Sequence, residues 1–151
     1  MNSNSPINDL TLQMNRVFKA SPERMFSAWT EPDAIMRWFG LEGYHTLSAE
    51  VDLRVGGKYR FGTQDSDGTI YYISGTYREI QHPSKLVFTW VWAYEISNPN
   101  EEIMLVTVEF AAQGDTTRVL LTQEHLPDQQ SLQSHQRGWE SCFDLMQQFV
   151  S

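Results

Sequence analysis

Residues 135–150 of this chain read HQRGWESCFDLMQQFV. Counted from Trp139, the apolar residues Phe143, Met146 and Val150 follow after four, seven and eleven positions. This spacing places the four side chains on one face of an α-helix, which repeats about every 3.6 residues. The pattern therefore predicts a long C-terminal helix whose wide apolar face must cover a large partner surface.

The middle of the chain supplies that surface, because its apolar and polar residues alternate with the period of a β-strand. Six consecutive strands are predicted, around residues 51–55, 59–61, 70–80, 86–92, 106–110 and 119–125. Turn signals separate them at residues 56–57, 65–68, 82–84, 98–100 and 114–115. Connections of hairpin length make these strands an antiparallel meander.

The N-terminal part adds one strand and two short helices. Residues 1–8 are polar and are expected to be flexible, and a strand is predicted over residues 9–19. The segments 21–23 (Ser-Pro-Glu) and 30–32 (Thr-Glu-Pro) are helix-start signals, and Gly40 is placed to end the second helix. The prediction is one α+β domain over residues 9–151, in which a curved antiparallel sheet of about seven strands is covered by the C-terminal helix.

Composition narrows the classes of partner. The 151 residues carry a net charge of -8, so neither nucleic acid nor an anionic membrane surface is an expected partner. The single cysteine, Cys142, excludes an intrachain disulfide and a zinc site built of several thiolates. The sequence contains no secretory signal and no apolar run of about 20 residues, so a cytoplasmic protein is expected.

A set of short motifs, in order from about residue 10 to the C-terminus, resembles the activator of heat-shock-protein-90 ATPase homologue-like family. These motifs lie at residues 21–29, 32–40, 55–61, 75–80, 86–90 and 126–139. The resemblance implies the helix-grip fold of the START, polyketide-cyclase and birch-pollen-allergen superfamily, which often has a cavity between its sheet and its long helix. One departure is Gln123, which stands where many relatives carry a histidine. A chaperone partner is not expected, because the co-chaperone that names the family has a further N-terminal domain without a counterpart here.

Aromatic residues make up 13% of the chain, and many can converge on the concave side of such a sheet. They predict a pocket wall for a small hydrophobic or aromatic ligand, as in a lipid or polyketide carrier or sensor. The predicted ligand-binding residues are Trp38, Phe39, Tyr59, Phe61, Tyr72, Trp90, Trp92, Trp139, Phe143 and Met146. Three alternatives stay open: a filled core, an enzyme of cyclase or hydrolase type using the same cavity, and a protein-interaction module of co-chaperone type. A homodimer through exposed strand edges is also left open.

Residues for catalysis or metal binding are not predicted. The histidines are scattered, at His45, His82, His125 and His135. Cys142 and His135 would lie about 10.5 Å apart along a helix, too far for a nucleophile and its base. Glu50, Asp52 and Arg54 are expected to form a solvated ladder of charges on one strand face. No catalytic residue, metal or cofactor is therefore expected.

Overall fold

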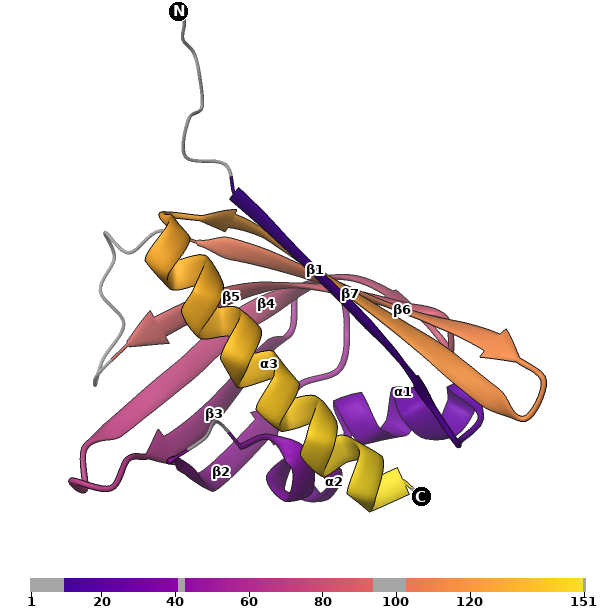
Figure 1. Cartoon of the computed structure of the whole chain (residues 1–151), viewed down its shortest axis with the longest axis horizontal. Coiled ribbons are helices and arrows are strands. Elements are labelled where there is room, and N and C mark those ends of the chain that lie inside the picture. Colours follow the sequence, from indigo (N-terminus) through magenta and orange to yellow (C-terminus); the bar gives the residue numbers. More distant parts are fainter. Residues whose placement is uncertain (1–9, 41–42, 94–102, 151) are drawn as a thin grey trace, which may run out of the picture.

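The computed structural model describes residues 10–40, 43–93 and 103–150. Their elements form a curved antiparallel sheet with a long helix lying across its concave side (Figure 1). The strands are β1 (Leu10–Phe18), β2 (His45–Val51), β3 (Lys58–Gln64), β4 (Ile70–Gln81), β5 (Lys85–Ala93), β6 (Met104–Gln113) and β7 (Thr116–Leu126). The helices are α1 (Pro22–Thr30), α2 (Pro32–Trp38) and α3 (Gln129–Val150). The seven strands lie in the order β1-β7-β6-β5-β4-β3-β2, which confirms the predicted helix-grip architecture.

The helices begin where the sequence signals them. The Ser21 hydroxyl accepts a hydrogen bond from the backbone N–H of Arg24 at 3.2 Å, and proline occupies the start of both α1 and α2. Asp128 caps α3 in the same way, because its Oδ1 accepts from the Ser131 N–H at 2.8 Å. Such caps pair N–H groups that the first helical turn leaves without a partner.

One prediction about the strands is wrong: residues 51–55 are not a strand. The strand is β2, which ends at Val51, and the chain then turns, with the N–H of Gly57 donating to the Arg54 carbonyl at 2.8 Å. Leu53 and Val55 alternate with polar residues but are 42% and 65% exposed in this turn. The turn at residues 98–100 lies outside the described residues.

Of the predicted ladder of charges, one ion pair forms among the described residues. The Arg54 Nε lies 2.9 Å from an Asp52 carboxylate oxygen, but both side chains are exposed and belong to this turn. An exposed pair of this kind contributes about 1 kcal/mol at most.

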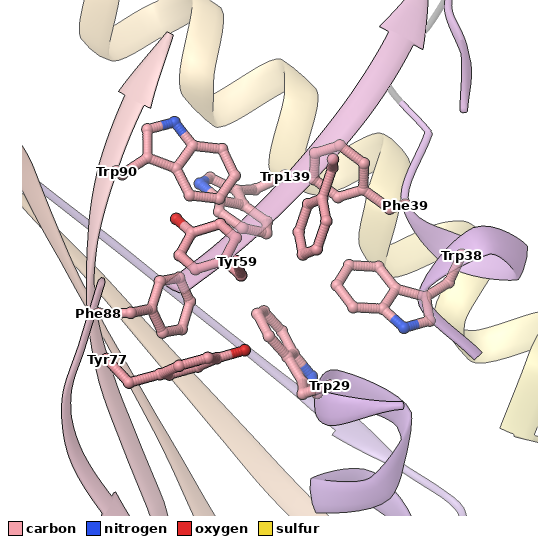
Figure 2. A pocket seen from close by; sticks show the side chains of 9 residues that line it. Trp29, Trp38, Phe39, Tyr59, Tyr77, Phe88, Trp90 and Trp139 are labelled. Atoms are coloured by element: carbon pink, nitrogen blue, oxygen red, sulfur yellow. The ribbon is translucent and has the colours of Figure 1, made fainter. Parts of the chain in front are cut away.

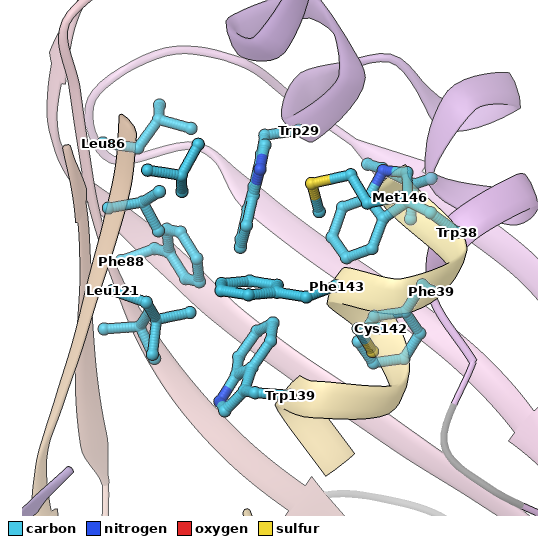
Figure 3. Packing of buried hydrophobic residues seen from close by; sticks show 14 of the residues in the cluster. Trp29, Trp38, Phe39, Leu86, Phe88, Leu121, Trp139, Cys142, Phe143 and Met146 are labelled. Atoms are coloured by element: carbon cyan, nitrogen blue, oxygen red, sulfur yellow. The ribbon is translucent and has the colours of Figure 1, made fainter. Parts of the chain in front are cut away.

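Helix α3 buries the predicted apolar face. Trp139, Phe143, Met146 and Val150 are all buried, and Figure 3 shows three of them pointing from α3 into the core. The helix packs directly on β1, β7 and α2. Its ring contact with β1 is edge-to-face, with the Phe18 and Phe143 centroids 5.7 Å apart. Over β3, β4 and β5 the concave face is covered largely by aromatic side chains.

None of the three described helices is long and apolar enough to cross a bilayer. The described residues also hold no group of three or more histidine, cysteine, aspartate or glutamate side chains that could bind a metal ion.

Candidate functional site

A small cavity lies where the three helices meet the concave face of the sheet (Figure 2). Its lining is entirely aromatic: Trp29, Trp38, Phe39, Tyr59, Phe61, Tyr77, Phe88, Trp90 and Trp139. The free space for a water-sized sphere is about 10 Å³, which is about the room that one water molecule needs. The rings therefore nearly fill the space that they enclose.

Side chains alternate between the two faces of each strand, and this alternation places several aromatic rings on the face that lines the cavity. On β3, Tyr59 and Phe61 are two residues apart and both buried, and Phe88 and Trp90 repeat this on β5. Tyr77 of β4 comes from a strand with a register shift between Tyr77 and Glu79. Residues of one strand that are two positions apart share a face, so these pairs point to the same side of the sheet.

A glycine on β4 makes room for the Tyr59 ring. A Cβ at Gly75 would lie 2.0 Å from the Thr89 carbonyl oxygen and 2.8 Å from Cε2 of Tyr59. The Tyr59 hydroxyl donates to that same Thr89 oxygen at 2.5 Å, so the ring crosses β4 at this glycine. Because Gly75 has no side chain, the Tyr59 ring can lie here and form one wall of the cavity.

Two of the four tryptophans in the lining are held by hydrogen bonds. The Trp38 indole N–H donates to the Ala28 carbonyl at 2.7 Å, and the Trp139 indole N–H donates to Oε1 of Gln123 at 2.8 Å. Gln123 is itself fully buried on β7. The Gln123 amide thus holds the ring of Trp139.

The other two tryptophans in the lining are not held in this way. The indole N–H groups of Trp29 and Trp90 are buried, and neither has a hydrogen-bond partner among the described residues. A buried donor without a partner costs about 1–3 kcal/mol. Such groups deserve an explanation in a well-packed protein.

One hydroxyl is directed into the ring-lined space. Figure 2 shows the Tyr77 hydroxyl pointing toward the ring of Trp29, and it makes no hydrogen bond that the described residues reveal. Burial raises the pKa of Tyr77 and of Tyr59 above the ordinary tyrosine value, so both remain neutral phenols. The lining contains no charged side chain, and the site is neutral as a whole.

The structure brings together six of the ten residues predicted to bind ligand: Trp38, Phe39, Tyr59, Phe61, Trp90 and Trp139. Three lining residues were not predicted. Phe88 shares a face with Trp90, so the alternation on β5 already contained its signal. Trp29 belongs to the buried face of α1 with Phe26. Tyr77 shares the inner face of β4 with Ile73, and it was missed because Tyr72, which lies on the other face, had been assigned to the cavity.

The other four predicted residues lie elsewhere. Phe143 and Met146 are buried in the core beside the cavity (Figure 3). Tyr72 is on the opposite face of the sheet from Phe61, because its neighbour Ile73 is the residue paired with Phe61. There the Arg60 guanidinium lies 4.3 Å from the centre of the Tyr72 ring. Trp92 is half-buried and contacts His135, outside the cavity lining.

His135 uses both of its ring nitrogens. The Trp92 indole N–H donates to Nε2 at 3.0 Å, and Nδ1–H donates to the Ser131 carbonyl at 2.8 Å. This arrangement requires the neutral imidazole, and burial lowers the pKa of His135 despite the opposing effect of the Ser131 bond. With no free nitrogen, His135 is not placed to act as a general base on a bound molecule.

Cys142 is an inert group in this arrangement. The thiol is fully buried, and burial raises its pKa to about 12 although a weak bond to the Gly40 carbonyl acts in the opposite direction. Reactive cysteines need the thiolate form and access to solvent, and Cys142 has neither.

Comparison with known proteins gives a consistent result. Residues 19–151 match the model of the family described as activator of Hsp90 ATPase homolog 1-like protein. A solved structure from Chromobacterium violaceum is 25% identical, with a TM-score of 0.83 and coverage of 93% of this chain and 97% of that one. One from Rhizobium leguminosarum is also 25% identical, with a TM-score of 0.80 and coverage of 94% of each chain.

A third solved structure, an AHSA1 protein from Silicibacter pomeroyi, is 22% identical, with a TM-score of 0.80 and coverage of 93% of this chain and 97% of that one. The comparison with curated proteins gives no match.

Proposed function

Since the chain belongs to the family of activator of Hsp90 ATPase homolog 1-like proteins, we propose that it binds a small, neutral aromatic molecule in the cavity between its sheet and α3. One observation carries the proposal: nine aromatic side chains surround an uncharged space into which the Tyr77 hydroxyl is directed. Ligand sites are mostly apolar and aromatic, with a few polar groups that orient the ligand.

The absence of charge in the lining selects against ionised ligands. A carboxylate moved from water into this site would meet no cation, and an unpaired buried charge is strongly unfavourable. Fatty acids and other ionised acids are therefore poor candidates. Ring molecules fit better, because they can stack on the rings of Trp90 and Trp139, whose centroids lie 5.0 Å apart.

The polar groups favour a ligand with an oxygen atom. The Tyr77 hydroxyl can both donate and accept a hydrogen bond. A phenol or a ketone on the ligand would pair with this hydroxyl, whereas a plain hydrocarbon would leave it unpaired. The expected class is a neutral aromatic compound that carries a hydroxyl or carbonyl group.

A matched series of probes tests this proposal. Binding of 2-naphthol, naphthalene and 2-naphthoate is measured by calorimetry at neutral pH, since the three share one ring system and differ in their polar group. The expected order of affinity is 2-naphthol, then naphthalene, then 2-naphthoate. Equal affinities, or preference for the carboxylate, would contradict the assignment.

Two variants that each remove one tyrosine hydroxyl identify the group that hydrogen-bonds to the ligand. Tyr77→Phe keeps the ring and should remove the preference for 2-naphthol over naphthalene, about tenfold for one hydrogen bond worth about 1.4 kcal/mol. Tyr72→Phe is the matched control, because Tyr72 lies on the opposite face of the sheet. If Tyr72→Phe has the same effect as Tyr77→Phe, the hydroxyl in the cavity is not the ligand's partner.

A further inference from the structure

We propose that the side chain of Trp29 occupies the inner part of the ligand site and is displaced when a ligand binds, an inference that rests on the proposed function. The cavity has room for about one water molecule, so no ring compound can enter unless a side chain leaves. The question is which of the nine lining rings can do so.

Trp29 is placed as a bound aromatic ligand would be. Its ring is stacked on Trp139, with an interplanar angle of 26° and centroids 5.7 Å apart. On its other sides it contacts Trp38 at 4.8 Å and the edge of Phe110 at 6.3 Å. Figure 2 shows the Tyr77 hydroxyl directed toward it. A ligand ring in the same place would stack on Trp139 and meet this hydroxyl.

Trp29 is also less firmly held than its neighbours. Trp38 and Trp139 donate hydrogen bonds to Ala28 and Gln123, whereas the buried Trp29 N–H has no partner among the described residues. Moving the ring to solvent would give that N–H a water partner, and this gain offsets part of the lost packing.

The position of Trp29 in the backbone also makes its side chain easier to displace than that of Trp90. Trp90 also has an unpaired N–H, but it stands on β5, which is hydrogen-bonded to β4 on one side and β6 on the other. Trp29 is next to the last residue of α1, a helix of nine residues outside the sheet. A side chain at a helix end can be displaced without breaking a β-ladder.

The decisive experiment follows the wild-type protein with 5-fluorotryptophan in place of tryptophan. The ¹⁹F signal of Trp29 is assigned with Trp29→Phe, and its shift between H₂O and D₂O reports exposure to solvent. With saturating 2-naphthol, the Trp29 signal should gain a solvent shift while that of Trp38 does not. If other lining signals move on binding but Trp29 stays shielded, displacement is refuted and the proposed function stands. If no signal responds, both fall.

Affinities of variants give an independent test. The wild type must expel the ring before binding, so Trp29→Ala should bind 2-naphthol at least about tenfold more tightly, with Trp29→Phe in between. Phe39→Ala is the matched control, because Phe39 is a lining residue without a polar group and also leaves a hole. An equal gain in both variants would reveal a generic cavity and overturn the inference, as would no gain in Trp29→Ala.

Discussion

The buried hydrogen bond between Trp139 and Gln123 gives the sharpest prediction about stability. Gln123 is fully buried, accepts from the Trp139 indole at 2.8 Å, and donates to the sulfur of Met104 at 3.3 Å. Trp139→Phe would leave the amide oxygen without this donor, and Gln123→Leu would leave the indole N–H without an acceptor. Each variant should therefore lose about 1–3 kcal/mol for the unpaired group, in addition to the cost of its changed shape.

The double variant separates these contributions. With both partners gone, no polar group of the pair stays unsatisfied, so the double variant should be more stable than the sum of the single losses implies, by about 1–3 kcal/mol. The free energy of unfolding is measured in urea by far-UV circular dichroism, because fluorescence would itself change with the tryptophan content.

A second cycle serves as the control. Trp38→Phe also removes a buried indole donor, but its partner is the backbone carbonyl of Ala28. Combined with Gln123→Leu, it should be additive within about 0.5 kcal/mol. Additivity in the Trp139 cycle as well would refute the role given to Gln123.

Three further predictions concern other parts of the core. Gly75→Ala should lower the free energy of unfolding by more than about 4 kcal/mol or prevent folding, because its Cβ would lie 2.0 Å from the Thr89 carbonyl oxygen. Gly114→Ala is the control: it has open space around it and a φ of 59°, and it should cost about 1–2 kcal/mol in the same urea assay. His135 has a lowered pKa in the folded state, so its contribution to stability should be complete above about pH 6.5 and decline as the pH falls below that value. Melting temperatures between pH 7.5 and 5.5 should therefore fall more steeply for the wild type than for His135→Gln, and equal slopes would rule out this role. Cys142, with its pKa raised to about 12, should resist iodoacetamide at pH 8 in the native protein and react fully in urea, and rapid native alkylation would show that the thiol is accessible.

The fold could be predicted from the sequence because its two periods are clear. The helical spacing of Trp139, Phe143 and Met146, together with a run of alternating segments, determines one long helix over an antiparallel meander. The error at residues 51–55 arose because alternation does not report burial. Leu53 and Val55 alternate correctly but lie in a turn, where both are largely exposed.

The residues that line the cavity were harder to predict than the fold, because the sequence does not show which face of each strand points inward. Side chains on the faces of β3 and β5 could be assigned from alternation, but Tyr72 was placed on the wrong face and Tyr77 was missed on β4. A strand's pairing register decides which of its residues face inward, and a shift by one residue reverses every face. Trp29 lies on the buried apolar face of α1, yet no local pattern in the sequence says that α1 lies over the same cavity.

Binding of a neutral aromatic molecule among the lining rings can be followed through the five indole N–H signals of ¹⁵N-tryptophan-labelled protein. Titration with 2-naphthol should shift the signals of the four lining tryptophans in a saturable way: Trp29, Trp38, Trp90 and Trp139. Trp92, which is outside the lining and donates to His135, should move least and serves as the internal reference. The absence of saturable shifts, or shifts confined to Trp92, would show that 2-naphthol does not bind among these rings.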